Sequence, residues 1–312
     1  MKIAIMGTGG VGGVFGALLA KAGEDVTFIA RGAHLKAIRE NGLQIVSKTN
    51  PEIHIKDAKA TDDPAEVGEV DIVLFCVKLW DTESAAELIK PMVGKDTAVV
   101  SLQNGISKDE ILASILGKEH MVGGISYVAS AITAPGIIEQ RGDRQKLVFG
   151  EFAHNGATKS PRVARFEEAC KNASIHAVVP DSIEVAIWEK FVFLVAMSSL
   201  CAGVRGSIGI VQSHPKTREL FIESMKEVLA VAVASGVDMP AETLDNQIAY
   251  FESLLPEVTA SMQVDLSQGN RIELPYLAGT VVELGEKLSV PTAVLRVLNG
   301  VLSPYADGAT LK

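Results

Sequence analysis

Cysteine is scarce in this sequence of 312 residues, which contains only Cys76, Cys170 and Cys201. Cysteines that are odd in number, far apart and in apolar surroundings support neither a disulfide framework nor a metal site. We therefore expect no bound metal, and we expect these residues to be buried free thiols in a reducing compartment, the cytoplasm.

The sequence also lacks long basic runs. It has 29 basic against 38 acidic residues, which gives a formal net charge of −9. This balance argues against nucleic acid and against an anionic membrane surface as partners. An anionic ligand would have to be bound by local positive charges.

Aromatic residues make up only 5% of the chain, whereas hydrophobic residues make up 47%. The chain can therefore bury a sizeable aliphatic core, and its composition excludes a disordered or low-complexity protein. At about 100 to 200 residues per domain, the length predicts two domains.

No continuous apolar run is long enough to cross a bilayer. Residues 3–20 are uncharged and follow Lys2, as in a signal peptide, but glycines beginning with Gly7 and Gly9 interrupt the run. The uncharged run at residues 191–204 is too short to span a membrane and is typical of a buried helix. We expect a soluble cytoplasmic protein.

The first half of the chain alternates strand-like and helix-like segments, the pattern of a parallel sheet covered by helices. Strands are predicted at residues 2–6, 25–30, 70–77, 97–102, 121–130, 136–140, 146–150 and 176–179, with shorter strands between 41 and 69. Helices are predicted at residues 11–22, 34–40 and 162–172.

From residue 181 onward the strand signals stop, and helical periodicity takes over. Helices are predicted at residues 183–204, 216–235, 241–255, 277–288 and 291–301. The sequence therefore predicts an α/β protein with a Rossmann-like doubly wound domain at 1–180 and an all-helical domain at 181–312. An apolar helical second domain is compatible with a homodimer.

The run Gly7-Thr8-Gly9-Gly10-Val11-Gly12 matches the G-x-G-x-x-G pattern and lies directly after a predicted strand, at the start of a predicted helix. The first glycine allows a tight turn, the second lets the backbone approach a pyrophosphate, and the third lets helix and strand pack closely. The phosphates would lie at the positive end of the helix. This placement predicts a dinucleotide-binding site.

Arg31 follows the second predicted strand, where an acidic residue would bind the ribose 2′-hydroxyl of NAD. A guanidinium at this position instead favours the 2′-phosphate of NADP(H). The alternative is a solvated surface arginine.

Lys78 and Asn104 follow the third and fourth long predicted strands. Ligands of a doubly wound sheet bind beyond the carboxyl ends of the strands, so both residues are candidates for the same cleft as the glycine-rich run. Taken alone, Lys78 is equally typical of a solvated loop, and Asn104-Gly105 is an ordinary turn dipeptide.

In the second half, Lys190 stands at the head of the uncharged run 191–204. Burying a lysine is costly unless it is paired or used, so Lys190 is a candidate proton donor; the alternative is a side chain that extends from the helix end to water. Ser261 and Glu273 form a second polar cluster with Asp265. As alternatives to a functional role, Ser261 could cap a helix and Glu273 could be an exposed surface residue.

Together these motifs resemble the ketopantoate reductase family (2-dehydropantoate 2-reductase). The resemblance is carried by the glycine run with Arg31, Lys78, Asn104-Gly105, Trp188-Glu-Lys190, and Ser261-Met-x-x-Asp265 followed by Glu273, in this order over nearly the whole chain. It implies NADPH-dependent reduction of 2-dehydropantoate to pantoate, on the route to coenzyme A. It also implies a Rossmann domain and a helical domain with the active site between them.

The resemblance implies a role for each matching residue. Lys190 matches the catalytic lysine that protonates the carbonyl oxygen, and Glu273 the glutamate that contacts the cofactor and assists the lysine. Lys78 and Asn104 match residues near cofactor and substrate, and Ser261 matches a substrate-binding hydroxyl. Hydride addition to a ketone makes an alkoxide, which needs a nearby positive charge and a proton.

The sequence departs from the family at Leu194 and Ser198, four and eight residues after Lys190. The family has substrate-binding asparagines at these positions, on one helical face. Losing such hydrogen bonds costs about 1 to 3 kcal/mol each, enough to change substrate preference. We therefore expect a pocket lined by Leu194 and Ser198 that is more apolar than is usual in the family.

Three functions follow from the sequence. The first is NADPH-dependent reduction of a small branched 2-oxo acid, with 2-dehydropantoate as the leading candidate. The second keeps the enzyme class but changes the substrate to a more apolar 2-oxo acid or ketone. The third is an NADP(H)-binding sensor without catalysis.

Overall fold

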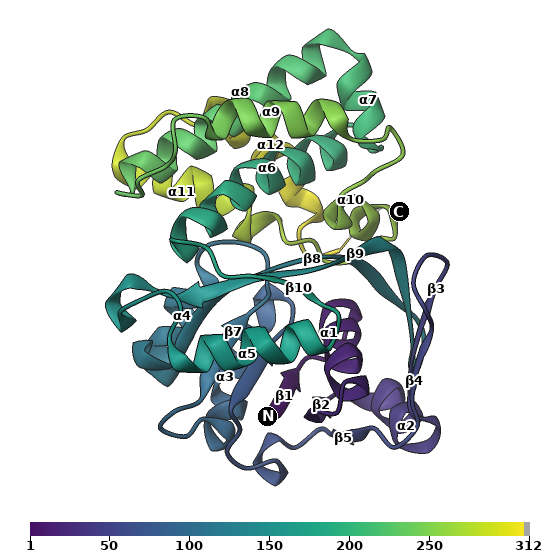
Figure 1. Cartoon of the computed structure of the whole chain (residues 1–312). Coiled ribbons are helices and arrows are strands. Elements are labelled where there is room, and N and C mark those ends of the chain that lie inside the picture. The colour runs from purple at the N-terminus through teal and green to yellow at the C-terminus, as the bar shows by residue number, and fades with distance from the viewer. Residues whose placement is uncertain (309–312) are drawn as a thin grey trace. The chain divides into compact units, whose positions relative to one another are not determined.

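The computed structural model describes residues 1–308 as two compact units (Figure 1). Unit 1 comprises Met1–Asn104 and Lys108–Ile183. Unit 2 comprises the short segment Gly105–Ser107 and the chain from Glu184 onward. Each unit has its own hydrophobic core.

Unit 1 alternates strands and helices, as the sequence predicts. Its strands are β1 (Lys2–Met6), β2 (Asp25–Ile29), β3 (Leu43–Ser47), β4 (Ile53–Ile55), β5 (Lys59–Thr61), β6 (Ile72–Phe75), β7 (Ala98–Ser101), β8 (Met121–Ala134), β9 (Ile137–Glu151) and β10 (His176–Val178). Its α-helices are α1 (Gly10–Lys21), α2 (Gly32–Asn41), α3 (Thr82–Ile89), α4 (Lys108–Leu116) and α5 (Pro161–Asn172). Short 3-10 turns include η2 (Leu79–Asp81), η4 (Lys118–His120) and η5 (Ala153–Asn155).

The strands form one sheet in the order β4-β3-β9-β8-β7-β6-β1-β2-β5, with β10 paired to β9. From β5 to β8 all pairs are parallel, whereas β8 with β9 and β3 with β4 are antiparallel. Because β2 and β6 flank β1 on opposite sides, the chain order reverses at β1, the position where doubly wound sheets bind ligands. The predicted Rossmann-like fold is confirmed.

Both faces of the parallel sheet are buried, because alternate side chains of each strand point to opposite faces. Ile3 and Ile5 belong to the core shared with α1 and α5. Ala4 and Met6 belong to the core shared with α3 and α4. The sheet is therefore covered by helices on both sides, which explains its continuous apolar runs.

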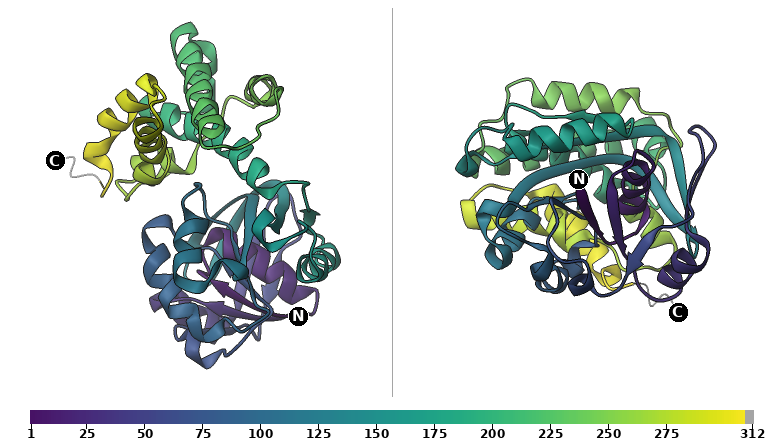
Figure 2. Two further views of the ribbon diagram at one scale, coloured as in Figure 1. Left: turned by 90° about the vertical axis from the view of Figure 1, so that its left-hand side faces the viewer. Right: turned by 60° about the horizontal axis from the view of Figure 1, so that its bottom comes forward.

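Strand β9 is one strand of 15 residues, so the prediction of two separate strands in this region is wrong. The polar residues between the predicted strands form an irregularity within the strand. Gln140, only 2% exposed, accepts a hydrogen bond from Gln145 Nε2 (2.9 Å) and donates one to the Arg144 carbonyl (3.3 Å). Figure 2 shows the long curved course of β8 and β9 in teal.

The described part of unit 2 is helical, as predicted. Its helices are α6 (Ile183–Gly203), α7 (Ile208–Ser213), α8 (Pro215–Ala234), α9 (Thr243–Ser253), α10 (Ser261–Ser267), α11 (Ala278–Leu288) and α12 (Ala293–Leu302), with short 3-10 turns η6 (Leu274–Tyr276) and η7 (Ser303–Tyr305). Helices α7 and α10 were not predicted, because six and seven residues are too few to show a period.

Helix α6 supplies a larger share of the core of unit 2 than any other helix. Within residues 1–308 it is the one helix long and apolar enough to span a membrane, and 67% of its most apolar window is buried in the protein. Such burial is what the sequence predicts for the core helix of a folded domain.

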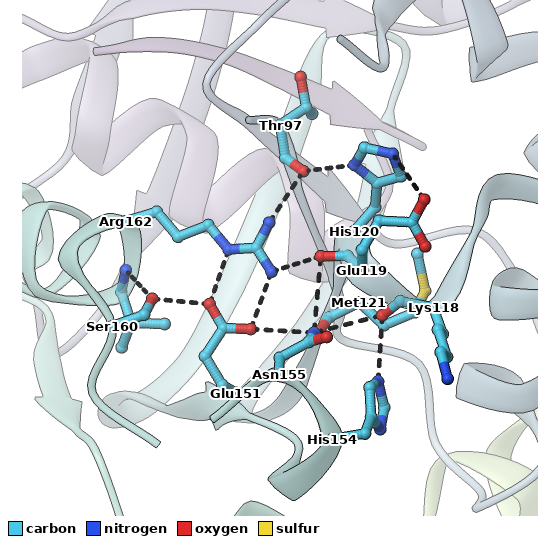
Figure 3. A network of polar contacts seen from close by, with 11 residues as sticks. Thr97, Lys118, Glu119, His120, Met121, Glu151, His154, Asn155, Ser160 and Arg162 are labelled. Carbon is cyan, nitrogen blue, oxygen red and sulfur yellow. Dashed lines mark hydrogen bonds and ion pairs between the residues drawn. The ribbon is translucent and has the colours of Figure 1, made fainter. Parts of the chain in front are cut away.

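A buried polar network lies at the amino ends of β7 and β8, opposite the ends where ligands bind in this fold (Figure 3). Arg162 donates two hydrogen bonds to Glu151, at 2.6 and 2.8 Å, and further bonds to the carbonyls of Thr97 and Glu119. Asn155 and Ser160 also donate to the Glu151 carboxylate. Burial raises the pKa of this carboxyl, but its hydrogen bonds and the Arg162 charge outweigh that and hold it below the usual value.

Replacing Arg162 by methionine is expected to destabilise unit 1 by about 3 to 5 kcal/mol at pH 7, because Glu151 would be left charged and buried without its partner. Urea unfolding measures this loss. Because folding lowers the pKa of Glu151, the ionised carboxylate contributes to the free energy of unfolding above pH 4.5, and this contribution fades as the pH falls below that value. The difference in unfolding free energy between Arg162→Met and wild type should therefore become smaller in acid.

The matched control is Arg165→Met, on the exposed side of the same helix. It is expected to change the unfolding free energy by less than about 0.5 kcal/mol. A comparable loss in both variants would contradict the role assigned to the Arg162–Glu151 pair.

Candidate active site

The loop between β1 and α1 has the backbone that the glycine pattern predicts. Gly7 has φ +97°, and a Cβ there would lie 2.9 Å from the backbone nitrogen of Val77. A Cβ on Gly12 would lie 2.3 Å from the carbonyl oxygen of Gly7. At Gly9, in contrast, a Cβ would meet nothing within 4 Å. The second glycine therefore faces open space where a phosphate group can approach the backbone.

The amino end of α1 is available to an anion. Its N-cap is Gly9, no side chain caps the helix, and its first turn contains no acidic residue. The free N–H groups and the helix dipole therefore remain for a ligand. These features fit the pyrophosphate of a dinucleotide.

Two further glycines of α1 allow the hairpin of β8 and β9 to pack on the helix. A Cβ on Gly10 would lie 2.5 Å from the carbonyl oxygen of Ser130 in β8. A Cβ on Gly13 would lie 2.1 Å from Cδ1 of Ile138 in β9. Sequence reasoning missed this contact. Its signal was that the start of α1 contains more glycines than the G-x-G-x-x-G pattern requires.

The side chains of Thr8 and Val11 serve the fold. The backbone N–H and the hydroxyl of Thr8 both donate to the Ile29 carbonyl, at 3.0 and 2.9 Å, and so fix the loop to the end of β2. Val11 packs against the core of unit 1. Because both donors of Thr8 bind Ile29, the backbone N–H of Val11 is the donor of the two residues that remains for a cofactor.

Arg31 is the N-cap residue of α2 and is exposed. Among residues 1–308 its guanidinium has no hydrogen-bond or ion-pair partner, so its charge is available to a ligand. His34, one turn further, was not singled out from the sequence: its Nδ1 accepts the backbone N–H of Gly136 (3.0 Å), and burial lowers its pKa. This hydrogen bond ties α2 to the hairpin of β8 and β9.

Lys78 and Asn104 lie at the ends of neighbouring strands. Lys78 is exposed and precedes η2, with its Nζ 5.6 Å from the ring centre of Trp80, which sequence reasoning did not single out. Asn104 is half-buried and precedes Gly105, whose φ is +89°. Because Val77 touches the Gly7 loop, the structure brings Lys78 to the glycine-rich loop.

Unit 1 thus gathers its predicted site residues at the carboxyl end of the sheet. The glycine-rich loop follows β1, Arg31 follows β2, Lys78 follows β6 and Asn104 follows β7. The pairing of β1 with both β2 and β6, and of β6 with β7, makes these positions adjacent.

In unit 2, Lys190, Leu194 and Ser198 are spaced by four residues along α6 and therefore share one face of the helix. Lys190 and Leu194 are partly buried, whereas Ser198 is only 1% exposed. The face thus offers a cationic end, an apolar centre and a buried hydroxyl.

Ser261 and Glu273 also belong to unit 2. Ser261 is exposed at the first residue of α10, but Ala260 is the N-cap and no side chain caps the helix, so the cap alternative is wrong. Glu273 is only 7% exposed, so the alternative of an exposed glutamate is wrong as well. Its carboxylate has no hydrogen-bond or ion-pair partner in the described chain. A largely buried glutamate whose carboxylate has no partner in the described chain is a candidate for ligand binding.

Comparison with known proteins decides the family. The profile of ketopantoate reductase PanE/ApbA matches residues 3–154, and the profile of its C-terminal part matches residues 182–306. The chain belongs to the ketopantoate reductase family. It is therefore an oxidoreductase that uses a nicotinamide cofactor, as the sequence predicts.

The similarity extends over the whole length of several family members. The 2-dehydropantoate 2-reductase of Archaeoglobus fulgidus is 30% identical over 308 residues, 98% of each chain. The crystal structure of a PanE/ApbA family ketopantoate reductase from Ralstonia eutropha superimposes with a TM-score of 0.88 at 31% identity and 98% coverage of both chains. A D-mandelate dehydrogenase, 22% identical with a TM-score of 0.86 over 98% of both chains, shares the fold.

Proposed function

We propose that the protein reduces 2-dehydropantoate to pantoate with NADPH in the cytoplasm. Lys190 carries this proposal, because it is the one group on its face of α6 that can supply both a positive charge and a proton. Full-length similarity to proteins named 2-dehydropantoate 2-reductase supports the substrate.

The residues of unit 1 are assigned to the cofactor. The N–H groups of Gly9 to Gly12 at the start of α1 would bind the pyrophosphate, and Arg31 would bind a 2′-phosphate. Lys78 and Asn104 would lie near the nicotinamide end, since Lys78 follows β6, which pairs with β1, and Asn104 follows β7, which pairs with β6. When bound, the reduced cofactor supplies a hydride to the substrate carbonyl carbon.

The residues of unit 2 are assigned to the substrate and to proton transfer. Lys190 donates a hydrogen bond to the carbonyl oxygen and delivers its proton as negative charge develops there. Glu273, a carboxylate without a partner in the described chain, contacts the cofactor and orients the ammonium of Lys190. Ser261 and Asn104 hold the polar groups of the substrate.

A second candidate is the same reaction on a more apolar 2-oxo acid. Leu194 favours it, because an isobutyl group one turn from Lys190 offers no hydrogen bond to the hydroxyl group of 2-dehydropantoate. The buried hydroxyl of Ser198 is shorter than an amide and replaces at most one such bond.

The test is NADPH oxidation by the purified protein with 2-dehydropantoate and a panel of branched and aromatic 2-oxo acids. We expect 2-dehydropantoate to have the highest kcat/KM by at least about tenfold, or about 1.4 kcal/mol. A higher value for an apolar acid would establish the second candidate. Tight NADPH binding without turnover of any carbonyl compound would instead favour a sensor.

The variant Leu194→Asn sharpens this assay. Adding an amide one turn from Lys190 should raise the ratio of kcat/KM for 2-dehydropantoate to that for an apolar acid, by about tenfold if one hydrogen bond is gained. The matched control is Leu229→Asn, a partly buried leucine on α8. An unchanged ratio in Leu194→Asn would remove residue 194 from the substrate pocket.

A further inference from the structure

A chain of hydrogen bonds connects the loop after β6 with the loop after β7 in unit 1. The Ser101 hydroxyl donates to Oε1 of Gln103 (3.0 Å), and Nε2 of Gln103 donates to the Thr82 hydroxyl (2.9 Å). That hydroxyl in turn donates to the backbone carbonyl of Leu79 (2.7 Å). Because Thr82 uses its single proton on Leu79, the amide group facing it must be the donor, which fixes the orientation of Gln103.

The three side chains that form this series of hydrogen bonds are buried. Ser101 is 0%, Thr82 1% and Gln103 7% exposed. Each side-chain nitrogen and oxygen atom of these three residues has a hydrogen-bond partner, so no polar atom of the network is unsatisfied. Buried networks that are fully satisfied hold a unique geometry, because any displacement leaves polar atoms without partners in a medium of low dielectric constant.

The network ends directly beside two predicted site residues. Leu79 follows Lys78, and Gln103 precedes Asn104. The hydrogen bonds from Gln103 through Thr82 to the carbonyl of Leu79 therefore fix the distance between the two loops. They do so directly beside Lys78 and Asn104.

A second anchor holds the far side of the loop after β7. The ammonium of Lys108, only 1% exposed, donates to the backbone carbonyl of Ser101 (3.2 Å) and to the carboxylate of Asp109 (2.7 Å). Between the two anchors the chain runs through Asn104 and Gly105–Ser107, the segment that belongs to unit 2. Asn104 therefore lies between the anchor at Gln103 and the anchor at Lys108.

We propose that Gln103 is a positioning residue, whose amide holds Lys78 and Asn104 in register for the reaction. This inference rests on the proposed function. Errors of about 1 Å in the placement of reacting groups lower rates by about a hundredfold, so a link that fixes two loops influences turnover without touching the substrate.

The test uses Thr82→Val and Gln103→Leu, which keep the volume and remove the hydrogen bonds. Both should lower kcat by about 10- to 100-fold. The Kd for NADPH should change less than about threefold, because the phosphates are assigned to the α1 loop and Arg31. Thr82→Ser keeps the hydroxyl and should restore kcat to within about threefold of wild type.

The matched control is Thr97→Val. Thr97 is also a buried threonine (2% exposed) whose hydroxyl donates to a backbone carbonyl, that of Val70 (2.6 Å), but it lies at the amino end of β7. It should lose stability as Thr82→Val does and keep its kcat. An equal fall of kcat in Thr97→Val and Thr82→Val would overturn the proposal.

Hydrogen exchange tests the link without using activity. In Thr82→Val, amides of residues 78–82 and of residues 102–104 should both exchange at least about tenfold faster, because the link joins the two loops. Faster exchange near Thr82 alone would refute the link. If wild type reduces no 2-oxo acid, the proposed function fails, while the exchange rates still decide whether Gln103 couples the loops. If Gln103→Leu does not fold, both kcat and hydrogen exchange are measured on Thr82→Val.

Discussion

Replacing Lys190 by alanine should lower kcat for reduction of the 2-oxo acid at least about a hundredfold. The variant loses both the positive charge that stabilises the developing alkoxide and the proton that neutralises it. Its Kd for NADPH should stay within about twofold of wild type, because the cofactor phosphates are assigned to unit 1. Steady-state kinetics and NADPH fluorescence measure the two quantities.

Two further variants separate charge from proton transfer. Lys190→Arg keeps the charge, but a guanidinium is a much weaker acid than an ammonium and releases its proton reluctantly. The kcat of this variant should therefore lie between those of Lys190→Ala and wild type. Lys226→Ala removes an exposed lysine of α8 that pairs with Glu223, and it should leave kcat unchanged. Near-normal turnover of Lys190→Ala would show that another group donates the proton.

Replacing Arg31 by alanine should raise the Kd for NADPH by about 10- to 100-fold, equivalent to the roughly 1.5 to 3 kcal/mol of a charge-assisted hydrogen bond. The Kd for NADH should change by less than about twofold, because NADH has no 2′-phosphate. Among residues 1–308 no carboxylate pairs with Arg31, so its whole charge is available to the phosphate. Fluorescence titration of both cofactors measures the effect.

Salt and a second arginine provide the controls. Because Arg31 is exposed, the preference of wild type for NADPH over NADH should weaken as salt is raised from about 0.05 to 0.5 M, and that dependence should disappear in the variant. Arg39→Ala, two turns further along α2, removes an arginine that binds the carbonyl of Ala60 and should affect neither cofactor. Equal losses for NADPH and NADH in Arg31→Ala would refute the 2′-phosphate assignment.

Much of the fold follows from local patterns. Alternating apolar strands and amphipathic helices predict the sheet of unit 1, and uninterrupted helical periodicity predicts unit 2. The pattern fails where local signals mislead. Polar residues between 140 and 146 interrupt the apolar strand pattern, but Gln145 donates a hydrogen bond to Gln140 inside β9. Helices as short as α7 and α10 carry too few residues to show a period.

The sequence by itself determined the glycine-rich loop, the cation at Arg31 and the spacing of Lys190, Leu194 and Ser198, because each depends on residues close together in the chain. Only the tertiary structure decided that Gly10 and Gly13 admit the β8–β9 hairpin and that Glu273 is buried without a partner in the described chain. It likewise decided that Gln103 binds Thr82, 21 residues away. These contacts join distant segments, and burial depends on what packs against a residue rather than on its neighbours in sequence.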